Sequence, residues 1–110
     1  MKDSKQQRLR ARGWKVGTTK DFLGLSSEEV AFIEMRLALA RLFAKRRAAL
    51  GLTQKHVAVR LGSSQSRIAK LEAGDPSVTV DLMIKSLLKL GASRRDVGRA
   101  IVAFAKKKSA

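Results

Sequence analysis

Cysteine is absent from the 110-residue sequence, and histidine occurs once, at His56. Disulfide bridges and thiolate metal sites are therefore excluded, and one chain cannot build a zinc site from several histidines. No second histidine, cysteine or acid–base pair supports a catalytic role for His56, and no glycine-rich phosphate loop is present. We therefore expect a protein that is not an enzyme and that binds no metal or cofactor.

Long apolar runs are missing as well. No apolar stretch approaches 18 residues, so we expect no membrane span. No apolar segment follows the basic N-terminus, which argues against a secretory signal. These absences predict a cytoplasmic protein, which we expect in a bacterium and associated with its nucleoid.

Acidic residues are scarce beside basic ones. Twenty-four Lys and Arg residues oppose nine Asp and Glu residues, which gives a formal net charge of +15 at pH 7. An excess of this size predicts a polyanionic partner. Nucleic acid fits best, while an acidic membrane surface and an acidic protein remain alternatives at this stage.

What the sequence has instead is helical patterning. Proline occurs once, so long segments are free to form helices, and no segment alternates as a strand would. Residues 1–20 hold seven basic residues and few apolar ones, which predicts a flexible basic arm. Residues 21–105 form the predicted folded domain, and residues 106–110 form a basic tail. Trp14 is a large apolar residue within this otherwise polar arm. We expect it either to pack on the domain or to anchor a partner.

The first predicted helix begins after Ser26 and runs to Leu50. Ser26 and Glu29 have the spacing of a capping box, and Gly51 marks the end. Two apolar stripes more than about 120° apart follow this helix. One stripe is Phe32, Met35, Leu39, Phe43 and Leu50, and the other is Val30, Ile33, Leu37, Ala40 and Ala44. We expect one stripe to face the core and the other to need the N-terminal segment, another subunit or a partner.

Four shorter helices follow, and their ends are marked by capping residues and glycines. The predicted N-caps are Thr53, Ser64, Thr79 and Ser93, the last forming a second capping box with Asp96. The predicted stops are Gly62, Gly74 and Gly91. The predicted core residues of the fourth helix are Leu82, Met83, Leu87, Leu88 and Leu90. The predicted fold class is therefore all-α, with five helices and a long first helix.

The second and third helices carry the most specific local pattern, LTQKHVAVRLGSSQSRIAKLEAG over residues 52–74. Two short helices separated by a tight Gly-Ser-Ser turn are typical of a helix-turn-helix. Ala58 is small where the two helices must cross, and Gly62 tolerates the positive φ that the turn needs.

This stretch resembles the repressors of lambdoid phages and their Xre-type, Cro-like relatives. The matching positions are Leu52-Thr53-Gln54, Gly62, Ser64-Gln65 and Leu71-Glu72-Ala73-Gly74. The resemblance covers about residues 39–103. It implies a five-helix phage-repressor-like domain that binds double-stranded operator DNA, often as a homodimer, and represses transcription.

A narrower resemblance involves GWKVGTTKDFLGLSSEEVAFIEMRLALAR, residues 13–41. This segment is similar to the lead-in of Xre-type antitoxins of the host-inhibition-of-growth kind. The similarity implies a cognate ribonuclease-like toxin and autoregulation of the shared operon. The alternatives are a stand-alone or phage-type repressor, a toxin-neutralising module with secondary DNA binding, and a nonspecific nucleic-acid chaperone.

The phage-repressor resemblance also implies roles for single residues. The predicted DNA-binding residues are Gln54, Lys55, Ser64, Gln65, Ser66, Arg67 and Lys70. Gln65 and Arg67 lie in the first turn of the recognition helix, where Gln can pair with adenine and Arg with guanine. We expect Lys55, on the preceding helix, to contact phosphates only. Arg47 and Glu72 match positions that form an ion pair across the domain.

The sequence departs from the repressor pattern at three positions. His56 and Val59 stand where relatives often carry polar or acidic residues. Ala73 replaces a residue that is often polar, which puts one phosphate contact in doubt.

Overall fold

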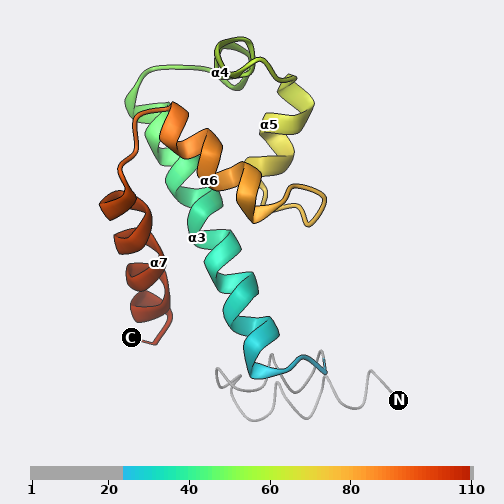
Figure 1. Ribbon diagram of the computed structural model, residues 1–110, viewed down its shortest axis with the longest axis vertical. Coiled ribbons are helices and arrows are strands. Elements are labelled where there is room, and N and C mark those ends of the chain that lie inside the picture. The colour runs from blue at the N-terminus through green and yellow to red at the C-terminus, as the bar shows by residue number, and fades with distance from the viewer. Residues whose placement is uncertain (1–23, 110) are drawn as a thin grey trace, which may run out of the picture.

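The computed structural model describes residues 24–109, with side chains up to residue 103. The described residues form helices and loops, as Figure 1 shows, and contain no strand. The helices are α3 (Ser27–Ala49), α4 (Gln54–Leu61), α5 (Gln65–Glu72), α6 (Val80–Lys89) and α7 (Arg94–Ser109). The predicted all-α, five-helix fold is confirmed. The expected arm over residues 1–20, including Trp14, lies outside the described residues.

Each helix begins where the capping pattern predicts. Ser26 Oγ accepts the amide N–H of Glu29 at 3.1 Å, while Glu29 Oε1 accepts the amide N–H of Ser26 at 2.8 Å. Ser93 and Asp96 make the same reciprocal pair at the start of α7. Thr53, Ser64 and Thr79 each accept the amide N–H three residues later, at 3.1 Å. Since these bonds connect neighbouring residues, the local sequence suffices to fix the helix starts.

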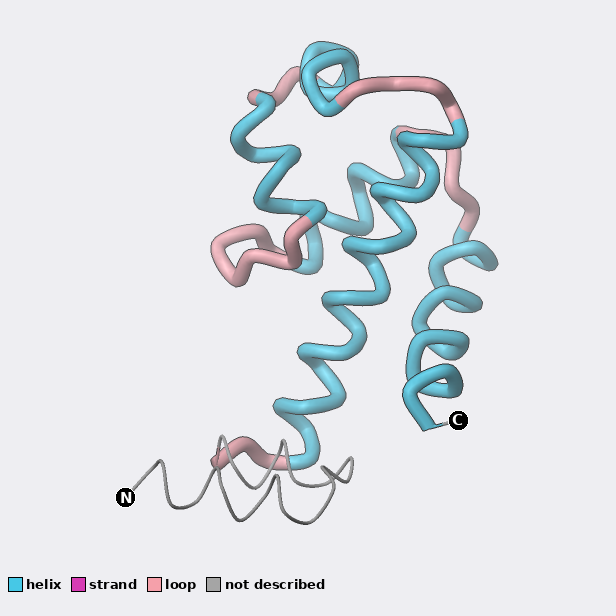
Figure 2. Tube along the Cα trace, turned by 180° about the vertical axis from the view of Figure 1, so that it is seen from behind, coloured by secondary structure: helices cyan, strands magenta, loops and turns pink. Residues whose placement is uncertain are grey.

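The long helix α3 is the element around which the others pack. In Figures 1 and 2, α7 lies alongside α3, and α4, α5 and α6 surround its C-terminal half. The largest fully buried side chains are Phe43, Leu39, Ile68, Leu71, Met83, Leu87 and Val57. Each such side chain stabilises the fold by roughly 1.5–3 kcal/mol relative to an exposed one. The core therefore lies at the C-terminal end of α3.

The prediction that one apolar stripe of α3 faces the core holds for only part of that stripe. Leu39 and Phe43 of that stripe are buried, but Phe32 and Met35 are 48% and 42% exposed. The other stripe divides in the same way, because Ala40 is buried and other members, Ile33 and Leu37, are exposed. Burial on α3 thus changes along the helix axis, since the other helices pack around its C-terminal half. Leu50 and the predicted core residue Leu88 are also exposed, at 42% and 44%.

Three arginines of α3 bind backbone carbonyls in the loops that join the helices. Arg46 Nε donates to the Leu90 carbonyl at 2.8 Å, and Arg47 Nη1 donates to the Leu52 carbonyl at 2.8 Å. Arg36 Nη1 donates to the carbonyls of Val78 and, at 3.3 Å, of Asp75. These bonds attach the α3–α4, α5–α6 and α6–α7 loops to α3. From the sequence alone, Arg36 and Arg46 count only as positive charge, whereas the repressor resemblance implies an ion pair with Glu72 for Arg47.

Gly91 illustrates why one of these loops needs a glycine. Its φ is +91°, and a Cβ atom there would lie 2.7 Å from Nη2 of Arg46. A side chain at this position would therefore meet both backbone strain and the arginine that holds the loop.

Within residues 24–109, no helix combines the length and the apolar character needed to cross a bilayer.

Candidate nucleic-acid interface

The helix pair α4 and α5 is anchored to the core from one side. Val57 and Ala58 of α4 and Ile68 and Leu71 of α5 are at most 3% exposed. Gly62 ends α4 with a φ of +68°, as predicted, and the next amide N–H, of Ser63, donates to the Ala58 carbonyl at 2.7 Å. The turn and the buried side chains together hold α5 in a fixed orientation, with its opposite side in solvent.

The solvent side of α5 carries most of the predicted DNA-binding residues. Gln65, Ser66, Arg67 and Lys70 are all exposed. With Ile68 and Leu71 facing the core, the 100° step of a helix directs Ser66 and Lys70 straight outward, with Gln65 and Arg67 on either flank. The structure thus brings these four side chains together on one helical surface.

Ser64 is exposed just before α5, but its hydroxyl has a structural partner. Ser64 Oγ accepts the amide N–H of Arg67 at 3.1 Å and caps the helix. The amide N–H groups of the first turn, at Gln65 and Ser66, have no acceptor within the helix and point toward its N-terminal end. Such an end carries a partial positive charge and favours anions.

An open polar cleft of about 530 Å³ lies beside this surface, between α5 and the start of α6. Its lining comprises Ser64, Ser66, Arg67, Lys70, Ser77, Val78, Thr79 and Leu82. Ser77 and Thr79 were not among the predicted site residues, although Thr79 was identified as a helix cap. The available sequence signal for this part of the site was Thr79, a hydroxyl-bearing helix cap that follows α5 in the chain.

Asp75 shapes the loop at the edge of this cleft. Its Oδ1 accepts the amide N–H of Ser77 at 2.8 Å. Hydrogen bonds from Ser77 hold the pKa of the Asp75 carboxyl below its ordinary value. The carboxylate is therefore ionised at neutral pH and is engaged by its own loop.

Arg47 and Glu72 are brought together in a two-pronged ion pair behind α5. The Nε–Oε2 distance is 2.5 Å and the Nη2–Oε1 distance is 3.0 Å. The Glu72 side chain is only 9% exposed. The hydrogen bond to Glu72 raises the pKa of Arg47 above its ordinary value. Because Arg47 also binds the Leu52 carbonyl, this pair connects α3, the α3–α4 loop and α5.

Gln54 belongs to the same network rather than to the open surface. Its side-chain amide donates to Glu72 Oε1 at 3.1 Å, and the residue is partly buried. Lys55, the next residue, is exposed on the first turn of α4. The structure thus places Lys55 in solvent and turns Gln54 toward the carboxylate that supports α5.

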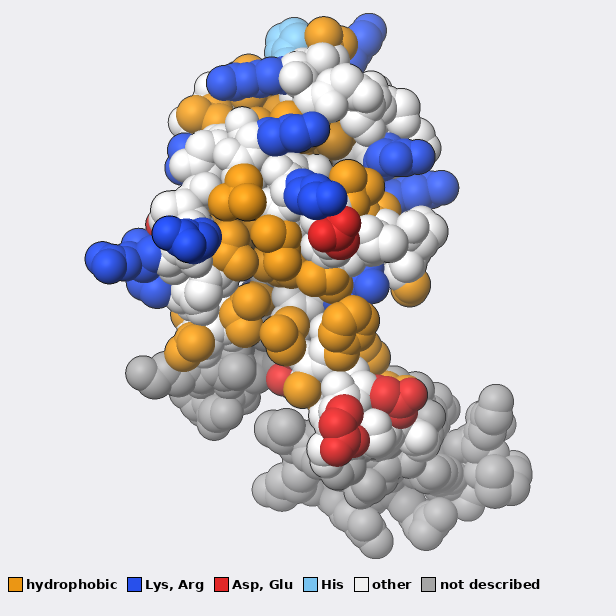
Figure 3. Space-filling view, viewed as in Figure 1, with side chains coloured by type: hydrophobic (Ala, Val, Ile, Leu, Met, Phe, Trp, Pro, Cys, Tyr) orange, Lys and Arg blue, Asp and Glu red, His pale blue; other side chains and the backbone are white. Residues whose placement is uncertain are grey.

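Charge is unevenly distributed over the described surface. In Figure 3, Lys and Arg side chains gather over the end formed by α4, α5 and α6, where an acidic side chain is also visible, and further acidic side chains lie at the N-terminal end of α3. The acidic residues in the first turn of α3 are Glu28 and Glu29. A polyanion therefore meets the α4–α6 end with the more favourable electrostatics.

Comparison with known proteins agrees with this geometry. The sequence profile of the helix-turn-helix family matches residues 43–97, half of the chain. The matched segment contains α4, α5 and α6 entire and extends into α3 and α7. No curated protein and no solved structure matches the chain.

Proposed function

Since the chain belongs to the helix-turn-helix family of DNA-binding transcriptional regulators, we propose that it is a sequence-specific repressor of double-stranded operator DNA. The observation that carries this proposal is the surface of α5, where Gln65, Ser66, Arg67 and Lys70 are exposed opposite a buried apolar side. A helix of this kind enters the major groove with its N-terminal residues at the base edges.

The proposed division of labour follows from side-chain chemistry. Arg67 offers a planar fork that matches guanine O6 and N7, and Gln65 can pair with adenine N6 and N7. Ser66 and Lys70 face the groove from the centre of the exposed surface. Together these side chains supply the sequence discrimination.

Phosphate contacts come from the surroundings of α5. Lys55 on the first turn of α4 and Ser64, the last residue of the turn before α5, are both exposed. The cleft lined by Ser77 and Thr79 adds hydroxyl groups next to Arg67 and Lys70. Contacts of this kind position the protein on DNA and carry no sequence information. Gln54 acts mainly through Glu72, by holding the carboxylate that orients α5.

The test is selection of binding sites from random DNA fragments, with the region upstream of the protein's own gene included. The affinity for the selected site is then compared with the affinity for scrambled DNA of equal length at one salt concentration. A ratio of about 10³ or more supports sequence-specific recognition. Equal affinities would leave only a nonspecific nucleic-acid binder.

We also propose a finer role, in which the protein is the antitoxin of a toxin–antitoxin pair, acts as a homodimer and represses its own operon in the bacterial cytoplasm. The exposed apolar residues of α3, among them Phe32 and Ile33, favour this role because they offer a surface for another protein. Within this proposal, residues 21–105 are the folded unit, and residues 1–20 and 106–110 are basic flanks. Co-purification of the protein with the product of a neighbouring gene, and loss of that product's toxicity, tests the antitoxin role. A protein that represses its operator without such a partner is a stand-alone repressor.

A further inference from the structure

One face of α3 carries a pattern that DNA recognition does not use. Ala31, Met35, Ala38, Leu42 and Ala49 recur at spacings of four, three or seven residues, with Lys45 at the remaining position of the series. A repeat of 3.5 residues is the spacing of a helix that packs lengthwise against another helix. The C-terminal part of this face is already hollowed, since an open groove of about 500 Å³ runs between α3 and α7.

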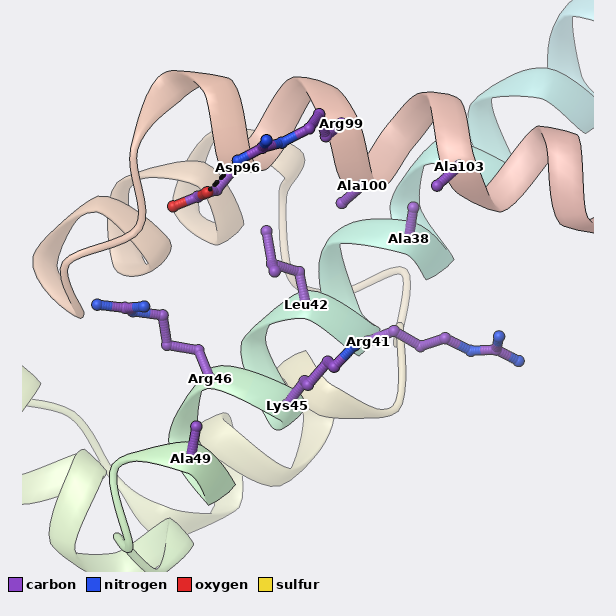
Figure 4. A pocket seen from close by; sticks show the side chains of 10 residues that line it. All are labelled: Ala38, Arg41, Leu42, Lys45, Arg46, Ala49, Asp96, Arg99, Ala100 and Ala103. Atoms are coloured by element: carbon purple, nitrogen blue, oxygen red, sulfur yellow. Dashed lines mark hydrogen bonds and ion pairs between the residues drawn. The ribbon is translucent and has the colours of Figure 1, made fainter.

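The groove has a small apolar floor and a basic rim. Its α3 lining includes Ala38, Leu42 and Ala49, and α7 adds Ala100 and Ala103. The rim consists of Arg41, Lys45, Arg46, Asp96 and Arg99. Figure 4 shows Arg41 and Arg46 pointing to opposite sides of α3, with Leu42 directed toward α7 between them. Small floor residues allow a further helix to approach closely, at an interaxial distance of about 8–10 Å.

The N-terminal part of the same α3 face has the opposite charge. Glu34 and Glu28 flank Ala31 and Met35, in the positions that Arg41 and Arg46 occupy at the other end. Met35 is 42% exposed, and Ala31 is exposed as well. The face is therefore acidic at one end, basic at the other and apolar along its middle, which makes it complementary to itself when reversed.

We infer that two copies of this chain associate through this face, with their α3 helices antiparallel and the N-terminal half of each α3 in the α3–α7 groove of the other. One register places Glu34 against Arg41 of the partner subunit. The same register places Met35 over the floor of the partner's groove at Ala38 of the partner subunit, a residue that is 3% exposed in one chain. The same register places Ala31 against Leu42 of the partner subunit, so each large apolar side chain faces a small one.

Charge favours the first half of a second copy's α3, rather than residues 1–23, as the segment that binds in the groove. The groove's rim holds four basic side chains against one carboxylate, so its net charge stays positive although Asp96 binds Arg99 at 3.1 Å and Arg46 binds the Leu90 carbonyl. Residues 1–23 of the chain contain seven basic and two acidic residues, so they are poorly matched to it. The first half of α3 combines acidic and apolar side chains on one face, which is the character that the groove requires.

This inference deepens the proposed dimer by naming its surface, and it is tested without DNA. Sedimentation equilibrium of the full chain measures the self-association constant for the original sequence, Glu34→Arg, Arg41→Glu and the double variant. Each single change places like charges together twice in the symmetric dimer, so association should weaken about tenfold or more. The double variant restores both attractions and should associate within about threefold of the original.

Mixing the two single variants gives the decisive result. A heterodimer of the Glu34→Arg chain and the Arg41→Glu chain has opposite charges at both contacts, so the mixture should recover association that neither variant shows alone. Arg95→Glu is the matched control, since Arg95 is exposed on α7 outside the groove and changes the net charge as Arg41→Glu does. Its association should stay within about twofold of the original.

A chain that stays monomeric at all concentrations would overturn the inference, as would a dimer that both single variants leave intact. Failure of mixing to restore association would also overturn it. Operator affinity is measured separately on the same variants. A dimer with this charge response that binds no operator would contradict the proposed function and leave the α3 surface standing.

Discussion

The two halves of α3 have similar sequence patterns and opposite surroundings. Leu39 and Phe43, in the C-terminal half, are 1% and 0% exposed. In the N-terminal half, Phe32 and Met35 are 48% and 42% exposed, although they belong to the same predicted stripe. The difference arises because α4–α7 pack around the C-terminal half. Periodicity thus identifies the face of a helix, and neighbouring elements decide how far along that face burial extends.

The largest expected difference in stability is between two substitutions on α3, one in each half of the helix. Leu39→Ala should lower the free energy of unfolding by about 2–5 kcal/mol, because it leaves a cavity among fully buried side chains. Met35→Ala, one turn earlier, should change it by less than about 0.5 kcal/mol in the monomer. Urea unfolding at a protein concentration below dimer formation measures both. Comparable losses would contradict the lengthwise division of α3.

The second comparison sets the partly buried ion pair behind α5 against an exposed one. Arg47→Met leaves Glu72, only 9% exposed, without its two-pronged partner and should destabilise the fold by about 3 kcal/mol. Lys85→Met removes the ion pair between Lys85 and Asp81, whose side chains are 67% and 76% exposed respectively. This change should lower the free energy of unfolding by at most about 0.5 kcal/mol. Urea midpoints compare the two variants. Equal midpoints would mean that the Arg47–Glu72 pair stabilises the fold no more than the exposed Lys85–Asp81 pair does.

The third prediction separates base recognition from phosphate binding at the α4–α5 end. Arg67→Ala should lose about 1–3 kcal/mol of affinity for the selected operator and much less for scrambled DNA. Lys55→Ala, equally exposed on α4, should lose a similar factor on both, because a phosphate contact is independent of sequence. Fluorescence anisotropy at fixed salt provides the four constants. If Arg67→Ala weakens both DNAs equally, Arg67 is a phosphate contact and the recognition scheme is wrong.

The smallest effect concerns the start of α7. Hydrogen bonds from Ser93 hold the pKa of Asp96 below its ordinary value, so the ionised carboxylate stabilises the folded state. This contribution is complete above the unfolded-state pKa of about 3.9 and disappears as the pH falls through the lower folded-state pKa. Asp96→Asn should therefore flatten the decline in stability below about pH 4. Urea midpoints between about pH 2 and 5 test this, and unchanged slopes would speak against it.

Much of the helical architecture could be predicted because its signals are local. The starts of α3 and α7 are set by capping boxes between residues three apart, Ser26 with Glu29 and Ser93 with Asp96. Gly62 ends α4 in the left-handed conformation that only a glycine adopts easily. The exposed set on α5 follows from the helical period once Ile68 and Leu71 are assigned to the core.

The cleft residues Ser77 and Thr79 and the inward turn of Gln54 could not be predicted in the same way. Thr79 has a clear local role as a cap, yet its nearness to Arg67 and Lys70 depends on how α6 crosses α5. Gln54 lies 18 residues from Glu72 in the sequence, and the two meet only because α4 and α5 pack together.

The sequence by itself determined the helices, the helix-turn-helix and the excess of positive charge, because these depend on composition and on bonds within a turn or two. The tertiary structure decided what Arg36 and Arg46 of α3 do and which half of α3 is covered. Arg36 and Arg46 reach carbonyls 42 and 44 residues away, and no local pattern distinguishes them from solvated cations such as Lys45. The physical reason is that such bonds form only after distant segments have packed, when a buried carbonyl without a donor becomes costly.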